Sequence, residues 1–278
     1  NAMNIGRFFS RNWLTGYAVV YMLVLYLPVV LLPLFAFNAS TIIAFPLTGF
    51  TFEWFGVLFE TKALHSAVQN SLIIAVITSI LSTLLGTLGA RAMVRYRFPL
   101  KRGIVGLIMV PLILPEIIVG VSLLVLLMQI GISLSIWTVI AGHVLICVPF
   151  SVAILSSAFQ GLDPSLEEAS MDLGETRFGT FRRVIMPLIL PGIISSLLIT
   201  FTISLDEFII AFFLTGTDVT LPVYIWGQMR FPTKLPSVMA LGTILLVLSV
   251  FLLVLGEVFR RRSASRQGQD ASATGGLM

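Results

Sequence analysis

A polar stretch separates two apolar blocks of the chain: residues Gly161 to Pro191, GLDPSLEEASMDLGETRFGTFRRVIMPLILP. Asp163-Pro164 is typical of a helix start, because Asp caps the first N–H groups and proline at the first helical position loses no hydrogen bond. Glu167 and Glu168 suit the positive end of the helix dipole. Small or apolar residues recur at helical spacing, at Leu166, Ala169 or Ser170, and Leu173. Gly174 predicts a left-handed C-cap, so the stretch begins with a short amphipathic helix that ends in a corner.

A second short helix is expected after this corner, with Phe178 and Phe181 on one side. Pro187 is expected to end this second helix, and Pro191 to lie just inside the next apolar block. Two short helices at an angle on a membrane face form a structure that another protein can grip.

The composition is that of an integral membrane protein. The 278 residues are 57% hydrophobic and 11% charged, with a mean hydropathy of +1.03, whereas soluble domains contain about 25% charged residues. The net charge of +4 does not indicate nucleic acid binding, because the basic residues lie at the ends of apolar blocks.

Six blocks are long enough for spanning helices, which need about 20 mostly apolar residues. They are roughly Leu14–Phe37, Ser66–Ala90, Gly103–Met128, Ile136–Phe159, Leu188–Leu214 and Val238–Phe259. Proline interrupts several of them, which membranes tolerate where neighbouring helices satisfy the freed carbonyls. The runs show no alternation, so the sequence predicts an all-α membrane protein.

The basic residues predict the orientation. Of the 17 Lys and Arg residues, 14 fall on one side of the predicted spans. The three on the other side are Lys62, Arg230 and Lys234. Both termini and the Gly161–Pro187 loop are therefore expected in the cytoplasm.

One membrane domain is expected over residues 14–260, with the polar loop at 161–191. Residues 1–13 form a cytoplasmic N-terminus in which Asn1-Ala2, ahead of Met3, resembles an expression-tag scar. Residues 261–278 form a Ser- and Gly-rich cytoplasmic tail that we expect to be disordered. No cleavable signal peptide is predicted.

Catalytic and metal motifs are missing from the sequence. It has no G-x-x-x-x-G-K-[ST] motif, so this chain is not expected to hydrolyse ATP, and it has no H-E-x-x-H motif. Cys147 is the one cysteine and cannot form an internal disulfide. For His143, a helix–helix hydrogen bond is favoured over a substrate contact.

Two outer segments carry aromatic residues. Asn38–His65 is favoured as an interfacial aromatic belt, and the alternative is that it also lies under an extracytoplasmic binding protein. Thr215–Ser237, with Tyr224 and Trp226, is expected to dip partly into the membrane near the mouth of a path.

Acidic residues inside predicted spans are candidates for that path. Glu116 follows Pro115 in the third span, and Asp206-Glu207 lies midway along the fifth, close to Phe208. A charge at the bilayer centre costs about 2.5–3.5 kcal/mol, so such acids face a polar path or a partner. Carboxylates interleaved with aromatic rings suit an organic cation. The alternative is that Glu116 and Asp206 bond backbone or arginine at the interface with a second subunit.

The polar stretch resembles the EAA loop of bacterial ABC importer permeases. The resemblance rests on Glu168-Ala169-Ser170, Gly174, Phe181, Val184, Pro187 and Pro191, with Ser170 in place of the usual second Ala. In that family the loop is the coupling helix, which docks into a groove on a cytoplasmic ATPase. The resemblance implies that Glu168, Ala169, Ser170 and Gly174 form this contact, and that Phe181 and Pro187 tie the loop to the fifth span.

Further stretches are similar to the second permease subunit of spermidine/putrescine-type ABC importers. They are VRYRFP at Val94–Pro99, PLILPEIIVG at Pro111–Gly120, LDPSLEEASMDLG at Leu162–Gly174 and SLDEFIIAFF at Ser204–Phe213. The resemblance implies the six-span type I (MetI-like) fold, in the inner membrane of a bacterium. The expected path residues are Glu116, Asp206, Glu207, Phe208, Tyr224 and Trp226.

The implied partners are a homologous permease, or a second copy of this chain, two ATPase subunits that bind ATP and Mg²⁺, and an extracytoplasmic binding protein. Alternating access would carry a polyamine, or else another amine, an opine, a phosphonate or ferric iron. Two other classes stay open: a proton-coupled secondary carrier that uses Glu116 and Asp206 as a relay, and a membrane scaffold or insertion factor.

Overall fold

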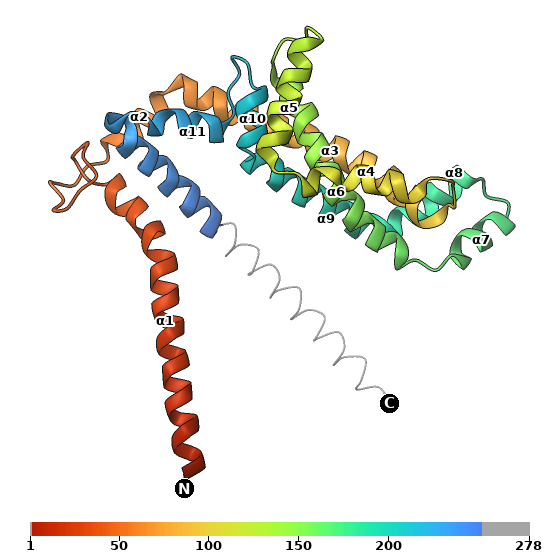
Figure 1. Cartoon of the computed structure of the whole chain (residues 1–278), viewed down its shortest axis with the longest axis horizontal. Coiled ribbons are helices and arrows are strands. Elements are labelled where there is room, and N and C mark those ends of the chain that lie inside the picture. The colour runs from red at the N-terminus through yellow and green to blue at the C-terminus, as the bar shows by residue number, and fades with distance from the viewer. Residues whose placement is uncertain (1, 252–278) are drawn as a thin grey trace, which may run out of the picture. The chain divides into compact units, whose positions relative to one another are not determined.

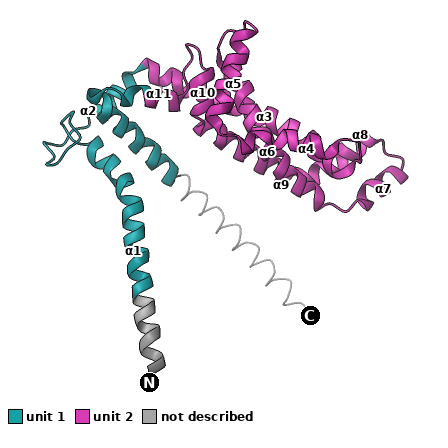
Figure 2. Cartoon of the chain, viewed as in Figure 1, with its two compact units in different colours: residues 1–61, 227–278 teal, residues 62–226 magenta. Residues whose placement is uncertain are grey.

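The computed structural model describes residues 2–251, with side chains from residue 13 onward, and every named element in this range is a helix (Figure 1). The chain divides into two compact units, residues 1–61 with 227–278 and residues 62–226 (Figure 2). The all-α prediction is confirmed, whereas the single-domain boundaries stay a prediction and the expected disordered tail lies outside the described residues.

Unit 2 contains most of the helices. They are α3 (Lys62–Arg95), α4 (Lys101–Ile113), α5 (Glu116–Gln129), α6 (Ile136–Gln160), α7 (Ser165–Asp172), α8 (Arg177–Thr180), the π-helical turn η1 (Phe181–Ile185), α9 (Met186–Asp206) and α10 (Ile209–Leu214). Unit 1 contains α1 (Ala2–Ala36), α2 (Glu53–Glu60) and the 3₁₀ turn η2 (Pro232–Lys234), which leads into the last helical segment. Helix α11 (Leu221–Met229) begins in unit 2 and ends in unit 1.

The predicted spans correspond to long apolar helices. Among the described residues, five helical segments are long and apolar enough to cross a membrane, and the bent pair α4–α5 makes a sixth if it counts as one span. The five are Trp13–Ala36, Lys62–Arg95, Ile136–Gln160, Arg177–Asp206 and Pro232–Phe251. The predicted end of the last span, at Phe259, lies outside the described residues.

The third predicted span, Gly103–Met128, is broken in two at a proline, as the sequence indicates. Helices α4 and α5 meet at 106°. The break follows from Pro115, because proline excludes the α conformation from the residue before it. Leu114 accordingly has φ −78° and ψ 141°, which is extended backbone.

A second break replaces the continuous helix expected through Asp206 and Glu207. Helix α9 ends at Asp206, and Glu207 has an extended backbone at φ −67° and ψ 117°. The Glu207 Oε1 then accepts the N–H of Ile210 at 2.7 Å, which caps α10. The two acids therefore do not sit on one regular helix.

The prediction that Pro187 ends a second short helix is wrong. From Arg177 the chain runs through α8 and η1 into α9, and it continues past both Pro187 and Pro191. In η1 the Met186 N–H donates to the carbonyl of Phe181, five residues back. Pro187 follows this wide turn in the first turn of α9, where its missing N–H is tolerated.

The interior of unit 2 is built on α3, α6 and α9, which pack together (Figure 1). Small hydroxyl residues connect these helices: the Ser196 Oγ lies 3.0 Å from the Thr83 Oγ1 and 2.7 Å from the Ser151 Oγ. The His143 Nδ1 lies 2.8 Å from the Ser204 Oγ, which confirms the predicted helix–helix hydrogen bond. Such small polar contacts are typical of helices packed within a membrane.

Gly86 lets α3 and α6 approach closely, so Gly86→Ala is expected to lower the melting temperature of the detergent-solubilised protein. An added Cβ would lie 2.0 Å from the Ser151 Oγ and 3.0 Å from its carbonyl carbon, and overpacking of this kind costs about 1–3 kcal/mol. Gly106→Ala in α4 is the matched control, because nothing lies within 4 Å of its Cβ position. Equal melting temperatures for the two variants would contradict the close packing.

Asn38 joins the two ends of the loop between α1 and α2 in unit 1. The Asn38 Oδ1 accepts the N–H of Thr48 at 3.0 Å, and its carbonyl accepts the Trp54 Nε1–H at 2.8 Å. The Phe37 ring packs on Phe50, with centroids 5.1 Å apart. The expected roles of this segment, as an aromatic belt or under a binding protein, stay predictions.

Candidate functional site

Helix α7 begins at Ser165, one residue later than expected, while Asp163 caps it as predicted. The Asp163 carboxylate accepts the N–H of Ser165 at 2.9 Å, and Pro164 stands at the cap position. The hydrogen bonds from Ser165 hold the pKa of Asp163 below its ordinary value. The start of this helix is thus specified locally by the Asp-Pro pair.

The end of α7 is a Schellman motif, which confirms the predicted left-handed cap. Gly174 has φ +90°, its N–H donates to the carbonyl of Met171 at 2.9 Å, and the Glu175 N–H donates to that of Ser170 at 3.2 Å. A residue with a Cβ would be strained at this φ. Gly174 therefore sets the direction in which the chain leaves α7.

One face of α7 is turned toward the rest of unit 2. The Glu167 Oε1 pairs with the Arg95 Nε at 2.9 Å, and its Oε2 lies 4.0 Å from the Arg91 Nη2. On the same face, the Ser170 Oγ lies 3.0 Å from the Thr180 Oγ1. These contacts connect α7 to the end of α3 and to α8.

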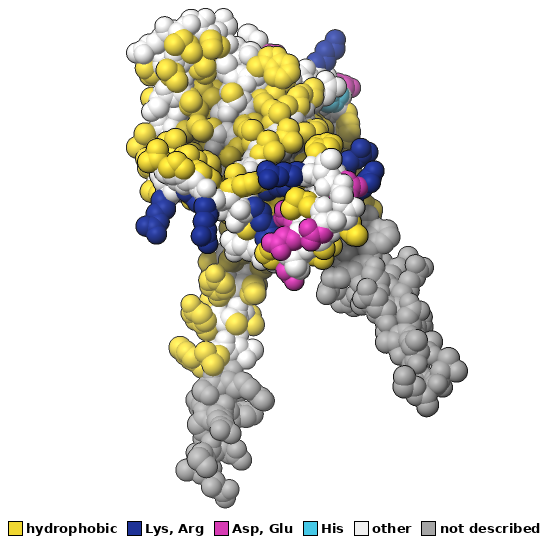
Figure 3. Space-filling view, turned by 90° about the vertical axis from the view of Figure 1, so that its right-hand side faces the viewer, with side chains coloured by type: hydrophobic (Ala, Val, Ile, Leu, Met, Phe, Trp, Pro, Cys, Tyr) yellow, Lys and Arg dark blue, Asp and Glu magenta, His cyan; other side chains and the backbone are white. Residues whose placement is uncertain are grey.

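The other face of α7 is exposed. Leu173 is 88% exposed and Leu166 is 43% exposed, while Glu168 and Ala169 are also exposed. On the end of unit 2 that carries α7, acidic side chains gather in one patch bordered by Lys and Arg (Figure 3). This face of α7 therefore presents apolar side chains beside charged groups at the surface of unit 2.

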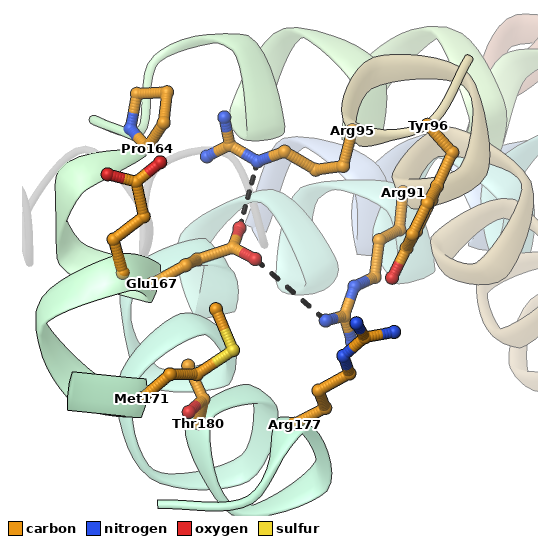
Figure 4. A pocket seen from close by; sticks show the side chains of 9 residues that line it. Arg91, Arg95, Tyr96, Pro164, Glu167, Met171, Arg177 and Thr180 are labelled. Carbon is orange, nitrogen blue, oxygen red and sulfur yellow. Dashed lines mark ion pairs between the residues drawn. The ribbon is translucent and has the colours of Figure 1, made fainter. Parts of the chain in front are cut away.

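A pocket of about 270 Å³ separates α7 from α3 and α8 (Figure 4). At this pocket, Glu167 is joined by ion pairs to Arg91 and Arg95. Its lining residues are Arg91, Arg95, Tyr96, Pro164, Glu167, Glu168, Met171, Arg177 and Thr180. The pocket is therefore charged on both sides and opens beside the exposed helix.

The structure divides the predicted coupling residues into two groups. Glu168 and Ala169 face outward, whereas Ser170 is turned toward Thr180. Phe181 lies beneath the Arg91 guanidinium at 4.5 Å, in the π turn that leads into α9. Pro187 is exposed in the first turn of α9.

Sequence reasoning missed several residues of this region. Arg91 and Arg95 were counted only as span-end charges, and Glu167 only as a helix-dipole charge. The spacing of four residues between Arg91 and Arg95 places both on one face of α3. This spacing was the signal in the sequence that the two could hold one partner together. Leu173 was recognised as a periodic apolar residue but not as part of the contact surface.

The predicted path acids lie at the two helix breaks. Glu116 is the first residue of α5, and Asp206 is the last residue of α9, and both are exposed. Glu207, at the second break, is buried. Since α5 packs on α10, the two helix breaks that carry these acids flank neighbouring helices.

Aromatic rings lie beside the second break. The Phe208 ring is 5.5 Å from both Phe212 and Trp226, measured between centroids. Tyr224 is two positions from Trp226 on α11, so its side chain points about 200° away, and no ring contact among the described residues joins it to this cluster. Phe208 and Trp226 are thus brought together, and Tyr224 is not.

Comparisons with known proteins agree with this architecture. The family model described as "Binding-protein-dependent transport system inner membrane component" matches residues 82–265. The chain is 35% identical over 268 residues to the spermidine/putrescine transport system permease protein PotC of Shigella flexneri, covering 96% of this chain and 99% of the relative. It is 36% identical over 231 residues to the putrescine transport system permease protein PotI of Escherichia coli (strain K12), covering 80% and 81%.

A solved structure shares the fold. It is the bacterial alginate ABC transporter in complex with an alginate pentasaccharide-bound periplasmic protein, with a TM-score of 0.67 and 18% identity over 88% of this chain and 93% of that chain. The predicted ABC importer permease fold is therefore confirmed. Because the family model covers most of the chain and the PotC match nearly all of it, this protein belongs to the family of binding-protein-dependent transport system inner membrane components.

Proposed function

We propose that this permease carries a polyamine such as spermidine or putrescine across the bacterial inner membrane, driven by a partner ATPase that docks on α7. The observation that carries the coupling role is the exposed apolar stripe of α7, formed by Leu166, Ala169 and Leu173, on a helix fixed to the spans by ion pairs. A partner that covers this stripe would bury apolar surface. Its movement would then be transmitted through α7 to the spanning helices.

In this proposal the outward residues Glu168, Ala169 and Leu173 contact the ATPase directly. Ser170, Gly174 and Phe181 support them: Ser170 bonds Thr180, Gly174 forms the cap, and Phe181 packs under Arg91. The ATPase dimer would bind ATP and Mg²⁺ and hydrolyse the nucleotide, so this chain would need no cofactor of its own.

The proposed path runs along the two helix breaks. Glu116, Asp206 and Glu207 supply negative charge, and Phe208 and Trp226 supply ring faces for ammonium groups. Tyr224 remains in the proposal as a residue of the outer mouth. A polyamine cargo is supported by the match of nearly the full chain to a spermidine/putrescine permease.

The remaining partners follow from the same class. A homologous permease would complete the path, and an extracytoplasmic binding protein would deliver the cargo on the side opposite α7. The asymmetry of Lys and Arg along the sequence supports a cytoplasmic location for the termini and α7. Arg91, Arg95 and Arg177 all lie at the end of unit 2 that carries α7 (Figure 4).

The proposal is tested in proteoliposomes that contain this permease, its encoded ATPase, partner permease and binding protein. Spermidine uptake should require ATP inside the vesicles and all four proteins, and a pH gradient should not replace ATP. Uptake by this chain alone, driven by a pH gradient, would instead support a secondary carrier. Failure of the ATPase to co-purify with the permease would contradict the coupling role.

A further inference from the structure

Two arginines at the end of α3 hold the coupling helix through one carboxylate. Arg91 and Arg95 are four residues apart and thus lie on the same face of α3. Glu167 of α7 pairs with the Arg95 Nε at 2.9 Å and approaches the Arg91 Nη2 at 4.0 Å. Figure 4 shows both contacts, with Glu167 directed between the two guanidinium groups.

Each arginine also contacts another segment of the fold. The Arg95 Nη2 donates to the carbonyl of Leu162, just beyond the end of α6, at 3.1 Å. The Arg91 guanidinium lies 4.5 Å from the centroid of the Phe181 ring, at the start of the π turn into α9. The pair therefore joins α7 to the cytoplasm-directed ends of all three central helices, α3, α6 and α9.

The contact at Glu167 determines which face of α7 is presented. Successive helical residues point about 100° apart, so a helix held by Glu167 and, one turn later, Ser170 turns Glu168, Ala169 and Leu173 outward. The exposures agree: the Glu167 side chain is 19% exposed and Leu173 is 88% exposed. The two neighbouring carboxylates thus differ: that of Glu167 is held by arginines of this chain, and that of Glu168 faces outward, where a partner can reach it.

We infer that Glu167, Arg91 and Arg95 form a positioning clasp that sets the rotation of α7 and transmits its movement to α3. The inference rests on the proposed function, since it concerns how the docked helix drives the spans. Without the clasp, α7 would lose its ion pairs to α3 and keep its flanking loops and its contacts with α8 and η1, so its displacement would reach α3 weakly.

The chemistry of the clasp suits a mechanical link. The Arg95 and Glu167 side chains are only 15% and 19% exposed. A buried ion pair adds little net stability over apolar residues of similar volume, so stability alone does not explain two arginines on one carboxylate. Arg95 uses its Nε for Glu167 and its Nη2 for Leu162 at the same time. Lysine carries a single nitrogen, so Arg95→Lys would keep the charge and lose one of the two links.

The test measures spermidine transported per ATP hydrolysed in the complete reconstituted transporter. Glu167→Gln is expected to lower this ratio by about fivefold or more, while ATPase co-purification stays at the level of the unmodified protein. Arg95→Lys should lower the ratio less than Arg95→Gln. Combining Glu167→Gln with Arg95→Gln should give less than the product of their separate effects, because both remove the same contact.

Glu175→Gln is the matched control. Glu175 pairs with Arg183 within the loop and does not reach α3. Its neutralisation should leave the transport-to-hydrolysis ratio unchanged. An equal fall for Glu175→Gln and Glu167→Gln would overturn the clasp, because loss of any loop charge would then have the same effect.

A structural readout completes the test. Spin labels on Asp172 and Leu100, both exposed, in a Cys147→Ser background, report the distance between α7 and the loop after α3. Glu167→Gln should broaden the distance distribution measured in the assembled transporter. An unchanged distribution together with an unchanged ratio would overturn the inference. Loss of ATPase binding by the unmodified permease would instead refute the proposed coupling function.

Discussion

Replacing Leu173 by aspartate is expected to abolish ATP-driven uptake while the permease stays folded and inserted. Leu173 is 88% exposed at the C-terminal end of α7, so the substitution removes little packing inside this chain. If a partner covers this side chain, the change forfeits about 1.5–3 kcal/mol of apolar burial and adds a charge that must be desolvated. ATPase binding should therefore weaken by more than about tenfold.

The measurement is ATPase co-purification and spermidine uptake, compared at equal amounts of permease with equal melting temperatures. Leu100→Asp is the matched control, since Leu100 is 82% exposed in the loop between α3 and α4. Its φ of +63° is one that Asp tolerates. Normal ATPase binding by the Leu173 variant would show that the apolar stripe of α7 is not the docking surface.

Features with local causes could be predicted from the sequence. The start of α7 follows from Asp163 and its end from Gly174, because both caps use groups within a few residues. The apolar runs likewise indicate the spans by length and composition alone. The prolines of the third span also indicate its break, since proline restricts the residue before it.

Features with distant or side-chain causes could not be predicted in this way. The break after Asp206 lies in SLDEFII, which contains neither Gly nor Pro, and depends on how the Glu207 carboxylate caps α10. Pro187 appeared to end a helix, but the wider π turn before it accommodates the missing N–H.

The contact of Glu167 with Arg91 and Arg95 also could not be predicted from the sequence. Glu167 and Arg95 are far apart in sequence, and every basic residue at a span end satisfies the positive-inside rule equally. Composition therefore could not distinguish arginines that hold α7 from those that only orient the chain. The contact emerges only when α3 and α6 pack in parallel and bring Arg95 beside Leu162.

Neutralising the acids at the helix breaks is expected to reduce spermidine uptake by about tenfold to a hundredfold, since a hydrogen bond to a charged group contributes about 1.5–3 kcal/mol. The variants are Glu116→Gln and Asp206→Asn, separately and combined. Both side chains are exposed, so the substitutions leave the folding of unit 2 largely unchanged.

The loss should be larger for spermidine than for putrescine, because spermidine carries more ammonium groups for the carboxylates to attract. Glu60→Gln, an exposed acid at the end of α2, is the matched control and should transport normally. Uptake of both polyamines at the unmodified rate by the combined variant would remove Glu116 and Asp206 from the path.

Glu207 requires a separate variant because its carboxylate also caps α10. Glu207→Gln keeps an oxygen that can accept the Ile210 N–H, so helix α10 should remain and only the charge is lost. Glu207→Ala leaves that N–H without its partner and should lower the melting temperature as well. If Glu207→Gln transports spermidine normally and Glu207→Ala does not, the carboxylate serves the cap alone. A fall in uptake by Glu207→Gln at an unchanged melting temperature would place its charge on the path, beside that of Glu116.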